Sequence, residues 1–163
     1  MGYDLYKVKN GEVVDVDWSN IKWGEYFRES VWGWKPLWQF ICLCVGSGIL
    51  TEEDEEQGWY NNCHYIDGAK ALKLADVLRE IIKDGSHIDY VNKRNERLDD
   101  LPLEDCDLCN ATGFRYDEHV NGECNGCHGE GKKKSFETYY RLDVESIEQF
   151  EDFCRHSGGF EIH

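Results

Sequence analysis

The sequence predicts an α+β fold, in which a small antiparallel sheet packs with two amphipathic helices and a cysteine-rich hairpin is inserted between them. Two β-rich runs flank an Asn-Gly turn near the start, two later segments repeat apolar residues at helical spacing, and paired cysteines lie between those segments. The 163 residues are 40% hydrophobic, which is enough for one body with a buried core. We expect residues 1–105 to form most of the body with its N-terminal β-hairpin and Trp-rich helical segment, 106–131 the hairpin, and 132–163 a strand and helix that complete the body.

The first third of the chain predicts a β-hairpin followed by short helices. Residues 3–8 and 13–18 are rich in strand-forming residues and flank Asn10-Gly11, a dipeptide that favours a tight hairpin turn. Short helices are then expected over residues 24–30 and 36–44, with Pro36 at a first helical position and Gly46 at the exit. Thr51 suits the N-cap of a further helix, whose acidic first turn complements the helix dipole.

The later segments predict two longer helices and one strand. Over residues 67–84 one apolar stripe recurs at three- and four-residue steps, and Gly85 suits the exit. Residues 92–105 are charged, which favours a surface connection. A strand is expected near residues 136–142, and the last helix should run from a cap at Asp143 to Gly158-Gly159, followed by a short strand-like segment. The apolar stripe of the first helix consists of Ala71, Leu74, Ala75, Leu78, Ile81 and Ile82. The stripe of the last helix consists of Val144, Ile147, Phe150 and Cys154.

Four cysteines in two equally spaced pairs predict a metal site. Cys106 and Cys109 form one Cys-x-x-Cys pair, and Cys124 and Cys127 form the other. Each pair can turn two thiolates toward one tetrahedral ion, so together they complete its coordination shell. Because catalytic zinc keeps a position open for water or substrate, four thiolates indicate one structural Zn²⁺ ion.

The glycines after each pair produce a resemblance to a known family. The segment Cys124-Asn-Gly-Cys127-His128-Gly-Glu-Gly131 resembles a Cys-x-x-Cys-x-Gly-x-Gly repeat of the cysteine-rich region of DnaJ-type chaperones, and Cys106 to Gly113 resembles a second copy in which Ala111 replaces the first glycine. The resemblance covers residues 106–131 and implies the metal role of the four cysteines. The resemblance implies nothing more, because the family has four repeats where this chain has two, and because this chain lacks the family's His-Pro-Asp signature.

Other roles for cysteine compete with this interpretation. The pairs could be redox-active, could ligate an iron–sulfur cluster, or could lie close together by chance, and His128 or His119 could replace a cysteine ligand. A second metal site is conceivable from Cys42, Cys44, Cys63 and His64. The alternative for these is a set of small buried residues, because Cys42 and Cys44 lie in an apolar helical run.

Charge predicts the class of partner. The formal net charge is -15, and its excess of acidic residues is spread along the chain. Such a surface disfavours direct nucleic-acid binding and favours a protein partner with a basic surface. No signal peptide or membrane-spanning stretch is apparent, and we expect a cytoplasmic protein.

Two segments are candidates for binding that partner. All six tryptophans lie between Trp18 and Trp59. Such aromatic residues serve as interface anchors, although they also fill the cores of small folds. The acidic run could dock on a basic groove, although its usual meaning is a solvated helix start. The candidate partner-binding residues are Trp32, Trp34, Trp38, Glu52, Glu53, Asp54, Glu55 and Glu56.

These features favour a non-enzymatic protein. The expected function is protein binding by an acidic, zinc-stabilised chain, acting as an inhibitor or adaptor that occupies a basic, nucleic-acid-binding surface of its partner. One alternative is a protein that binds a small molecule or nucleotide, or a hydrolase, with a Trp-lined pocket and a purely structural zinc. Another is a chaperone-like zinc module that binds unfolded chains. No phosphate-binding loop, nucleophile elbow or metalloprotease motif occurs in the sequence.

Overall fold

The computed structural model describes residues 2–163 and has the predicted α+β fold. The chain divides into two compact units. The first contains two segments, the chain up to Arg94 and Tyr140–His163, and the second contains Asn95–Tyr139. We call the first the body and the second the cysteine unit. The cysteine unit includes more residues at both ends than the predicted hairpin of residues 106–131. No helix in residues 2–163 is long and apolar enough to cross a membrane.

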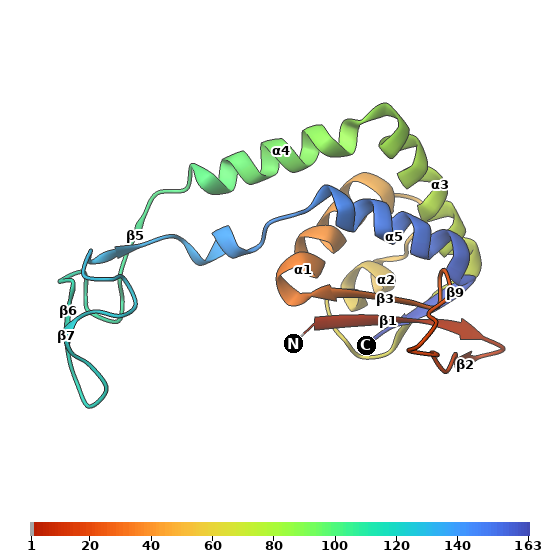
Figure 1. Ribbon diagram of the computed structural model, residues 1–163. Helices are drawn as coiled ribbons and strands as arrows, with labels where there is room; N and C mark the ends of the chain where they lie inside the picture. The colour runs from red at the N-terminus through yellow and green to blue at the C-terminus, as the bar shows by residue number, and fades with distance from the viewer. Residues whose placement is uncertain (1) are drawn as a thin grey trace. The chain divides into compact units, whose positions relative to one another are not determined.

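An antiparallel sheet of five strands forms one layer of the body (Figure 1). Its central strand β1 (Gly2–Lys9) pairs on one edge with β9 (Gly159–Ile162), which in turn pairs with β4 (His64–Asp67). The other edge of β1 pairs with β2 (Glu12–Val13) and β3 (Tyr26–Ser30). The predicted turn joins β1 to β2, because Asn10 and Gly11 both have positive φ, as a tight hairpin turn requires.

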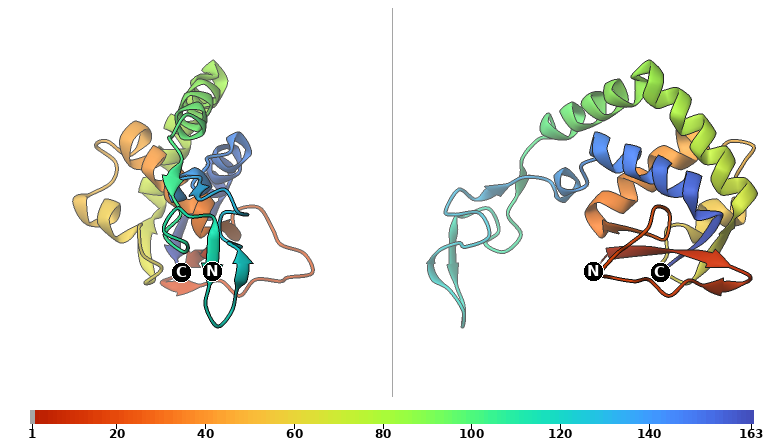
Figure 2. Two further views of the ribbon diagram at one scale, coloured as in Figure 1. Left: turned by 90° about the vertical axis from the view of Figure 1, so that its left-hand side faces the viewer. Right: turned by 45° about the vertical axis from the view of Figure 1, so that its right-hand side comes forward.

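Two predicted helices pack together on one face of this sheet. They are α3 (Gly68–Asp84) and α5 (Val144–Ser157), and Figure 2 shows them side by side above the strands. Asp67 caps α3 by accepting hydrogen bonds from the amides of Ala69 and Lys70, and Gly85 ends it at φ 79°. The predicted apolar stripes face the core, where Leu74, Leu78 and Phe150 are fully buried. The layer arrangement therefore follows from the local sequence signals.

The segment between β3 and β4 contains α1 (Val31–Phe40), a π-helical turn (Ile41–Val45) and α2 (Glu52–Gln57). Pro36 lies inside α1 instead of at its first position. Thr51 is the predicted N-cap of α2, and its hydroxyl accepts from the amide of Asp54 while the Asp54 carboxylate accepts from the amide of Thr51. This reciprocal pair is a capping box.

Four element predictions are wrong in whole or in part. The second strand of the predicted hairpin, expected over residues 13–18, is reduced to β2, which ends at Val13. Residues 24–30 contain β3 instead of a helix, because five residue pairs join this segment to β1. Residues 92–105 are not all surface connection, since α4 (Ser86–Asp99) continues through their first half. Residues 136–142 form no strand, and a single 3-10 turn occupies Phe136–Tyr139.

Candidate metal centre

The cysteine unit contains two pairs of very short strands. Strand β5 (Glu104–Asp105) pairs with β8 (Lys132–Lys133), and β6 (Phe114–Tyr116) pairs with β7 (Asn121–Glu123). One loop joins β5 to β6 and another joins β7 to β8, and each loop carries one Cys-x-x-Cys motif. We call residues 106–113 the first knuckle and residues 124–131 the second. With so few apolar residues available, the strands alone offer little buried area to hold the unit together.

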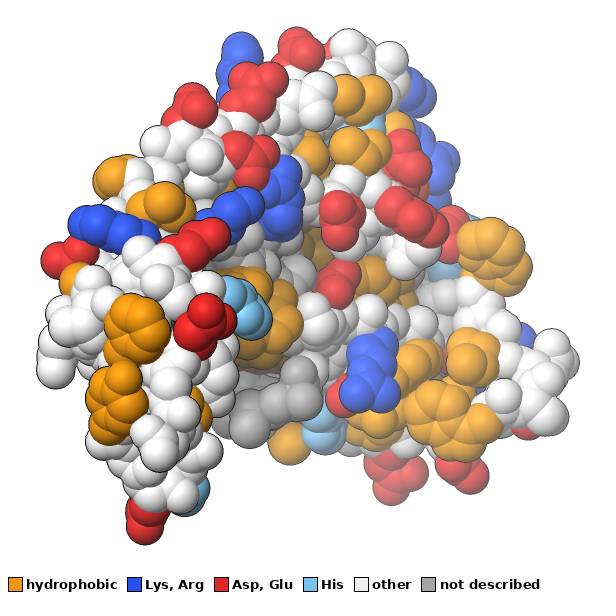
Figure 3. Space-filling view, turned by 60° about the vertical axis from the view of Figure 1, so that its left-hand side comes forward, with side chains coloured by type: hydrophobic (Ala, Val, Ile, Leu, Met, Phe, Trp, Pro, Cys, Tyr) orange, Lys and Arg blue, Asp and Glu red, His pale blue; other side chains and the backbone are white. Residues whose placement is uncertain are grey.

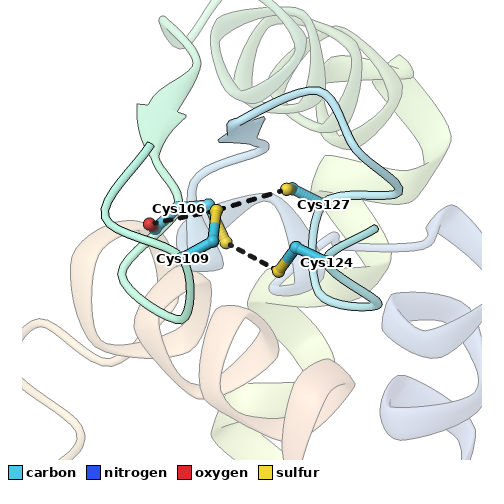
Figure 4. A group of neighbouring side chains, drawn as sticks. All are labelled: Cys106, Cys109, Cys124 and Cys127. Carbon is cyan, nitrogen blue, oxygen red and sulfur yellow. Dashed lines mark hydrogen bonds between the residues drawn. The ribbon is translucent and has the colours of Figure 1, made fainter. Parts of the chain in front are cut away.

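The side chains of the four predicted ligands converge on one point. Cys106, Cys109, Cys124 and Cys127 are all buried, and they form a hydrophobic cluster separate from that of the body. Their sulfur atoms all lie within 4.8 Å of one another. Figure 4 shows the thiols pointing toward one another from the two knuckles. The structure thus brings together all four residues that the sequence predicted.

The spacing of the sulfur atoms suits a metal ion better than disulfides. The sulfur of Cys106 lies 3.9 Å from that of Cys124, and the sulfur of Cys109 lies 3.7 Å from that of Cys127. Four sulfurs placed tetrahedrally about 2.3 Å from an ion are about 3.8 Å apart. A disulfide would need a separation of about 2.05 Å. All eight cysteines are free.

The second knuckle repeats the backbone of the first, 18 residues later in the chain. Asn110 and Ala111 have φ values of 49° and 62°, and their counterparts His128 and Gly129 have values of 50° and 80°. Gly113 and Gly131, which end the two knuckles, have φ values of 77° and 72°. Ala111 is therefore the one position where a left-handed glycine of the second knuckle is replaced by a residue with a side chain.

Backbone amides support the sulfurs in the same way in both knuckles. Gly113 donates its amide hydrogen to the sulfur of Cys109 at 3.3 Å, and Gly131 donates to the sulfur of Cys127 at 3.2 Å. Such hydrogen bonds stabilise a thiolate, so they favour the charged form that a metal ion requires.

The ionisation of these thiols reflects their crowding. Burial raises the pKa of Cys109. Hydrogen bonds, first of all from the Gly113 amide, outweigh burial, so the pKa of Cys109 is lowered to about 7. The pKa of Cys127 is raised to about 11, because burial and hydrogen bonds with the other three thiols raise it by more than the Gly131 amide lowers it. A second thiolate next to the first is costly because like charges repel, and a bound cation removes that cost. The donor set therefore fits a metal ion.

The histidines considered as replacement ligands stay outside the cluster. Among residues 2–163, the only groups placed to hold a metal are the four cysteines and a second group of Cys63, Glu161 and His163. Neither group includes His119 or His128. The second metal site considered from Cys42, Cys44, Cys63 and His64 does not form, because these residues are not gathered. The imidazole of His64 instead lies 3.0 Å from the carboxylate of Asp54.

The tryptophan prediction needs correction. Trp34 and Trp38 are fully buried and stacked, with ring centroids 5.4 Å apart. Their indole N–H groups donate to the carbonyls of Gly58 and Glu55, so both residues belong to the core. Trp32 remains half exposed at 38% and lies beside Tyr140. The most exposed tryptophans are Trp18 and Trp23, which the prediction had not selected.

The acidic run is also only partly available to a partner. Asp54 is 3% exposed and its carboxylate accepts a 2.5 Å hydrogen bond from Lys70. Burial raises its pKa, but hydrogen bonds from Lys70, Thr51 and His64 outweigh burial and lower the pKa to about 2. Asp54 is thus a structural residue and not a contact for a partner. Glu52, Glu53 and Glu56 are exposed, and Glu55 is half-buried.

The exposed apolar residues of the cysteine unit were missed by sequence reasoning. Phe114 is 52% and Tyr116 74% exposed, and alternation along β6 places both on the same face. Leu108, between the first two cysteines, is also exposed. The signal in the sequence was the pair Phe114 and Tyr116, two positions apart in a segment with few other apolar residues.

Comparison of the chain with protein-family models, curated proteins and solved structures finds no match. The resemblance to DnaJ-type repeats therefore rests on the spacing of cysteines and glycines in residues 106–131 alone.

Proposed function

We propose that this chain is a non-enzymatic binding protein in which one structural zinc ion holds the cysteine unit together, and that this unit presents apolar side chains to a protein partner. The observation that carries the proposal is the tetrahedral spacing of four buried sulfurs, 3.7 and 3.9 Å apart across the two knuckles. A shell of four thiolates leaves no open coordination position, which suits a structural role and not hydrolysis.

Zinc is the ion that the donor set favours. Four thiolates select soft or borderline ions, and tetrahedral sulfur ligation is typical of zinc and of iron–sulfur centres. Two knuckles with glycines at matching positions and two N–H···S bonds from backbone amides enclose the sulfurs closely. That leaves little space for the inorganic sulfides of a cluster and suits a single ion.

The face of β6 that carries Phe114 and Tyr116 is the proposed contact surface. Aromatic residues supply large contact area at low conformational entropy and dominate the energy of many interfaces. Both rings are more than half exposed on a unit that has no large apolar core of its own. Figure 3 shows hydrophobic side chains exposed among charged ones. An exposed aromatic pair of this kind supports a role in binding.

Charge favours a basic partner. Residues 95–139 contain 11 acidic and 5 basic residues, an excess of 6 negative charges before the thiolates are counted. This excess would steer the unit toward a positively charged surface, which includes the basic grooves of nucleic-acid-binding proteins. Acidic and basic side chains are interspersed in Figure 3, so we propose electrostatic steering combined with aromatic anchoring and not carboxylates alone.

Affinity capture from the native cell extract tests this function. The full chain, the double variant Phe114→Ser/Tyr116→Ser, and Leu72→Ser as an exposed-residue control on the body would be compared, with zinc content measured for each. We expect a protein captured by the wild type and the control, weakened at high salt, and lost with the double variant at unchanged zinc content. Capture of the same proteins by the double variant would contradict the proposal.

A further inference from the structure

A thiol, an imidazole and a carboxylate meet at one end of the body's sheet. Cys63 directly precedes β4, Glu161 lies in β9, and His163 follows it. The sulfur of Cys63 lies 3.4 Å from Nδ1 of His163, and Nε2 of the same ring lies 3.1 Å from Oε2 of Glu161. Cys63 is exposed, and the other two residues are half-buried. The proposed zinc unit uses none of these residues.

Backbone hydrogen bonds fix all three residues in the sheet. The amide of Cys63 donates to the carbonyl of Ile162 at 2.9 Å, so Cys63 lies opposite His163 when the ladder of β4 and β9 is extended by one residue. His163 is held from its other side by two 2.8 Å hydrogen bonds with the backbone of Asp4. Opposite residues of antiparallel strands place their side chains on the same face. Cys63 keeps this position at φ 65°, a conformation unusual for a residue with a side chain.

The geometry indicates a relay and not a chelate. Cys63 and Glu161 approach different nitrogens of the ring. A metal ion binds only one nitrogen of an imidazole, so although one donor atom from each residue lies within 4.8 Å of the others, ligation by all three would replace one of these two ring contacts. A carboxylate that accepts from Nε2 orients the ring and leaves Nδ1 free to accept a proton from the thiol. This is the arrangement of nucleophile, base and orienting group found in activated thiols.

We propose that Cys63 is the reactive thiol of this protein and a site of covalent modification by small disulfides. The Cys63 thiol passes its proton to Nδ1 of His163, and the thiolate attacks one sulfur of a disulfide R–S–S–R. A new sulfur–sulfur bond forms between Cys63 and one R–S group, while the original bond breaks and the other R–S⁻ leaves with the proton from the imidazolium. The sulfur of Cys63 is oxidised and the leaving sulfur is reduced, so electrons and protons balance.

The three cysteines outside the metal cluster other than Cys63 are poorer nucleophiles. Burial raises the pKa of Cys42 to about 11 and also raises the pKa of Cys44 and of Cys154. Thiols of this kind are weak nucleophiles near neutral pH. Cys44 is nevertheless exposed, as Cys63 is, which makes it an internal control for accessibility.

Several groups around the relay set its charge. From β1, Tyr6 contacts the His163 ring edge-on with centroids 5.2 Å apart, and Asp4 is its backbone partner. From β3, Tyr26 donates a hydrogen bond to Asp4, and Arg28 lies 3.6 Å from it. From β4, Tyr65 lies opposite Glu161. The relay therefore faces the carboxylates of Asp4 and Glu161 and the guanidinium of Arg28.

Modification kinetics of the full-length, metal-loaded protein test the proposal. Hydroxyethyl disulfide, a neutral probe, would be added at pH 7 and the adducts located by mass spectrometry of peptides. We expect one early adduct, on Cys63, which forms about tenfold more slowly in His163→Gln and more slowly by a smaller factor in Glu161→Gln. Cys44→Ser should leave the rate unchanged.

Three outcomes would overturn it. They are an adduct that forms first or equally on Cys44, an unchanged rate in His163→Gln with a native circular dichroism spectrum, and protection of Cys63 by added zinc that a chelator reverses. The last would assign these residues to a metal. Because the hydrogen bonds of His163 with Asp4 are made by the backbone, we expect the glutamine variant to keep the fold.

Discussion

The amide of Cys106 donates a hydrogen bond of 2.9 Å to the carbonyl of Gly131, so the first cysteine of one knuckle is tied to the last residue of the other. The reverse bond, from the amide of Cys124 to the carbonyl of Gly113, measures 2.8 Å. Each knuckle thus closes on its counterpart, and the four sulfurs keep their spacing only if both knuckles hold their backbone.

Gly131→Ala tests this mutual closure. A Cβ atom at position 131 would lie 2.3 Å from the carbonyl oxygen of Ala111, at a φ of +72°. We expect the clash and the strained backbone to weaken the metal site by about 2 kcal/mol, or about thirtyfold in affinity. Competition with a chromophoric chelator measures this change.

Gly11→Ala is the matched control for Gly131→Ala. Gly11 also has positive φ, +82°, but a Cβ atom there would have no neighbour within 4 Å, and the residue lies in the body's hairpin turn. Gly11→Ala should lower the free energy of unfolding of the body by about 1 kcal/mol and leave metal affinity unchanged. Equal metal affinity in both variants would show that closure between the knuckles is unimportant.

Ala111→Gly should strengthen the site. Ala111 adopts φ 62°, where its Cβ is unfavourable, and its counterpart Gly129 adopts φ 80° without that cost. We expect a gain of up to about 1 kcal/mol, reduced by the greater freedom of glycine in the unfolded chain. The opposite exchange, Gly129→Ala, should weaken metal binding. A chelator titration in which both variants shifted in the same direction would refute the equivalence of the two knuckles.

Much of this fold could be predicted because its signals are local. Asp67 and Gly85 mark the ends of α3, Thr51 marks the start of α2, and Asn10-Gly11 marks the turn, each through contacts within a few residues. The cysteine cluster could be predicted in the same way, because the spacing within each Cys-x-x-Cys pair is a local signal that these side chains meet.

The errors come from contacts that are distant in sequence. Strand β3 carries Arg28 and Glu29, and it is a strand only because β1 lies beside it. The burial of Trp34 and Trp38 depends on Gly58, whose added Cβ would lie about 2 Å from the Trp38 ring, and no local pattern reveals that approach. The relay of Cys63 and His163 joins residues 100 positions apart, so only the pairing of β4 with β9 brings it together.

The ion-paired Asp54 makes the body sensitive to acid. Its pKa is lowered from 3.8 to about 2, so its contribution is complete above pH 4 and is lost as the pH falls toward 2. The shift corresponds to about 2 kcal/mol. We expect Asp54→Asn to be less stable than the wild type at pH 5, with a smaller further loss between pH 4 and pH 2.

Urea unfolding across this pH range provides the measurement, with the exposed Glu53→Gln as a control. Acid removes any metal from the wild type and from each variant alike. The quantity compared is therefore the difference in the free energy of unfolding between each variant and the wild type. A difference that stays constant from pH 5 to pH 2 would contradict the role assigned to the Asp54 carboxylate.

Two leucines on α3 test the core. Leu74 is fully buried and Leu72, on the other face of the same helix, is 47% exposed. Leu74→Ala should lower the free energy of unfolding by about 2–5 kcal/mol, because it removes buried contacts and leaves a cavity. Leu72→Ala should change it by less than about 0.5 kcal/mol. Similar losses in the two variants, measured by thermal or urea unfolding, would mean that α3 does not pack on its predicted stripe.

X-ray absorption at the zinc edge, on protein purified without added metal, tests the central claim most directly. We predict one zinc ion per chain with four sulfur neighbours at about 2.3 Å, and loss of that signal in Cys127→Ser. A protein without metal whose residues 95–139 are still folded, or a zinc ion with an oxygen or nitrogen neighbour in place of a sulfur, would contradict it.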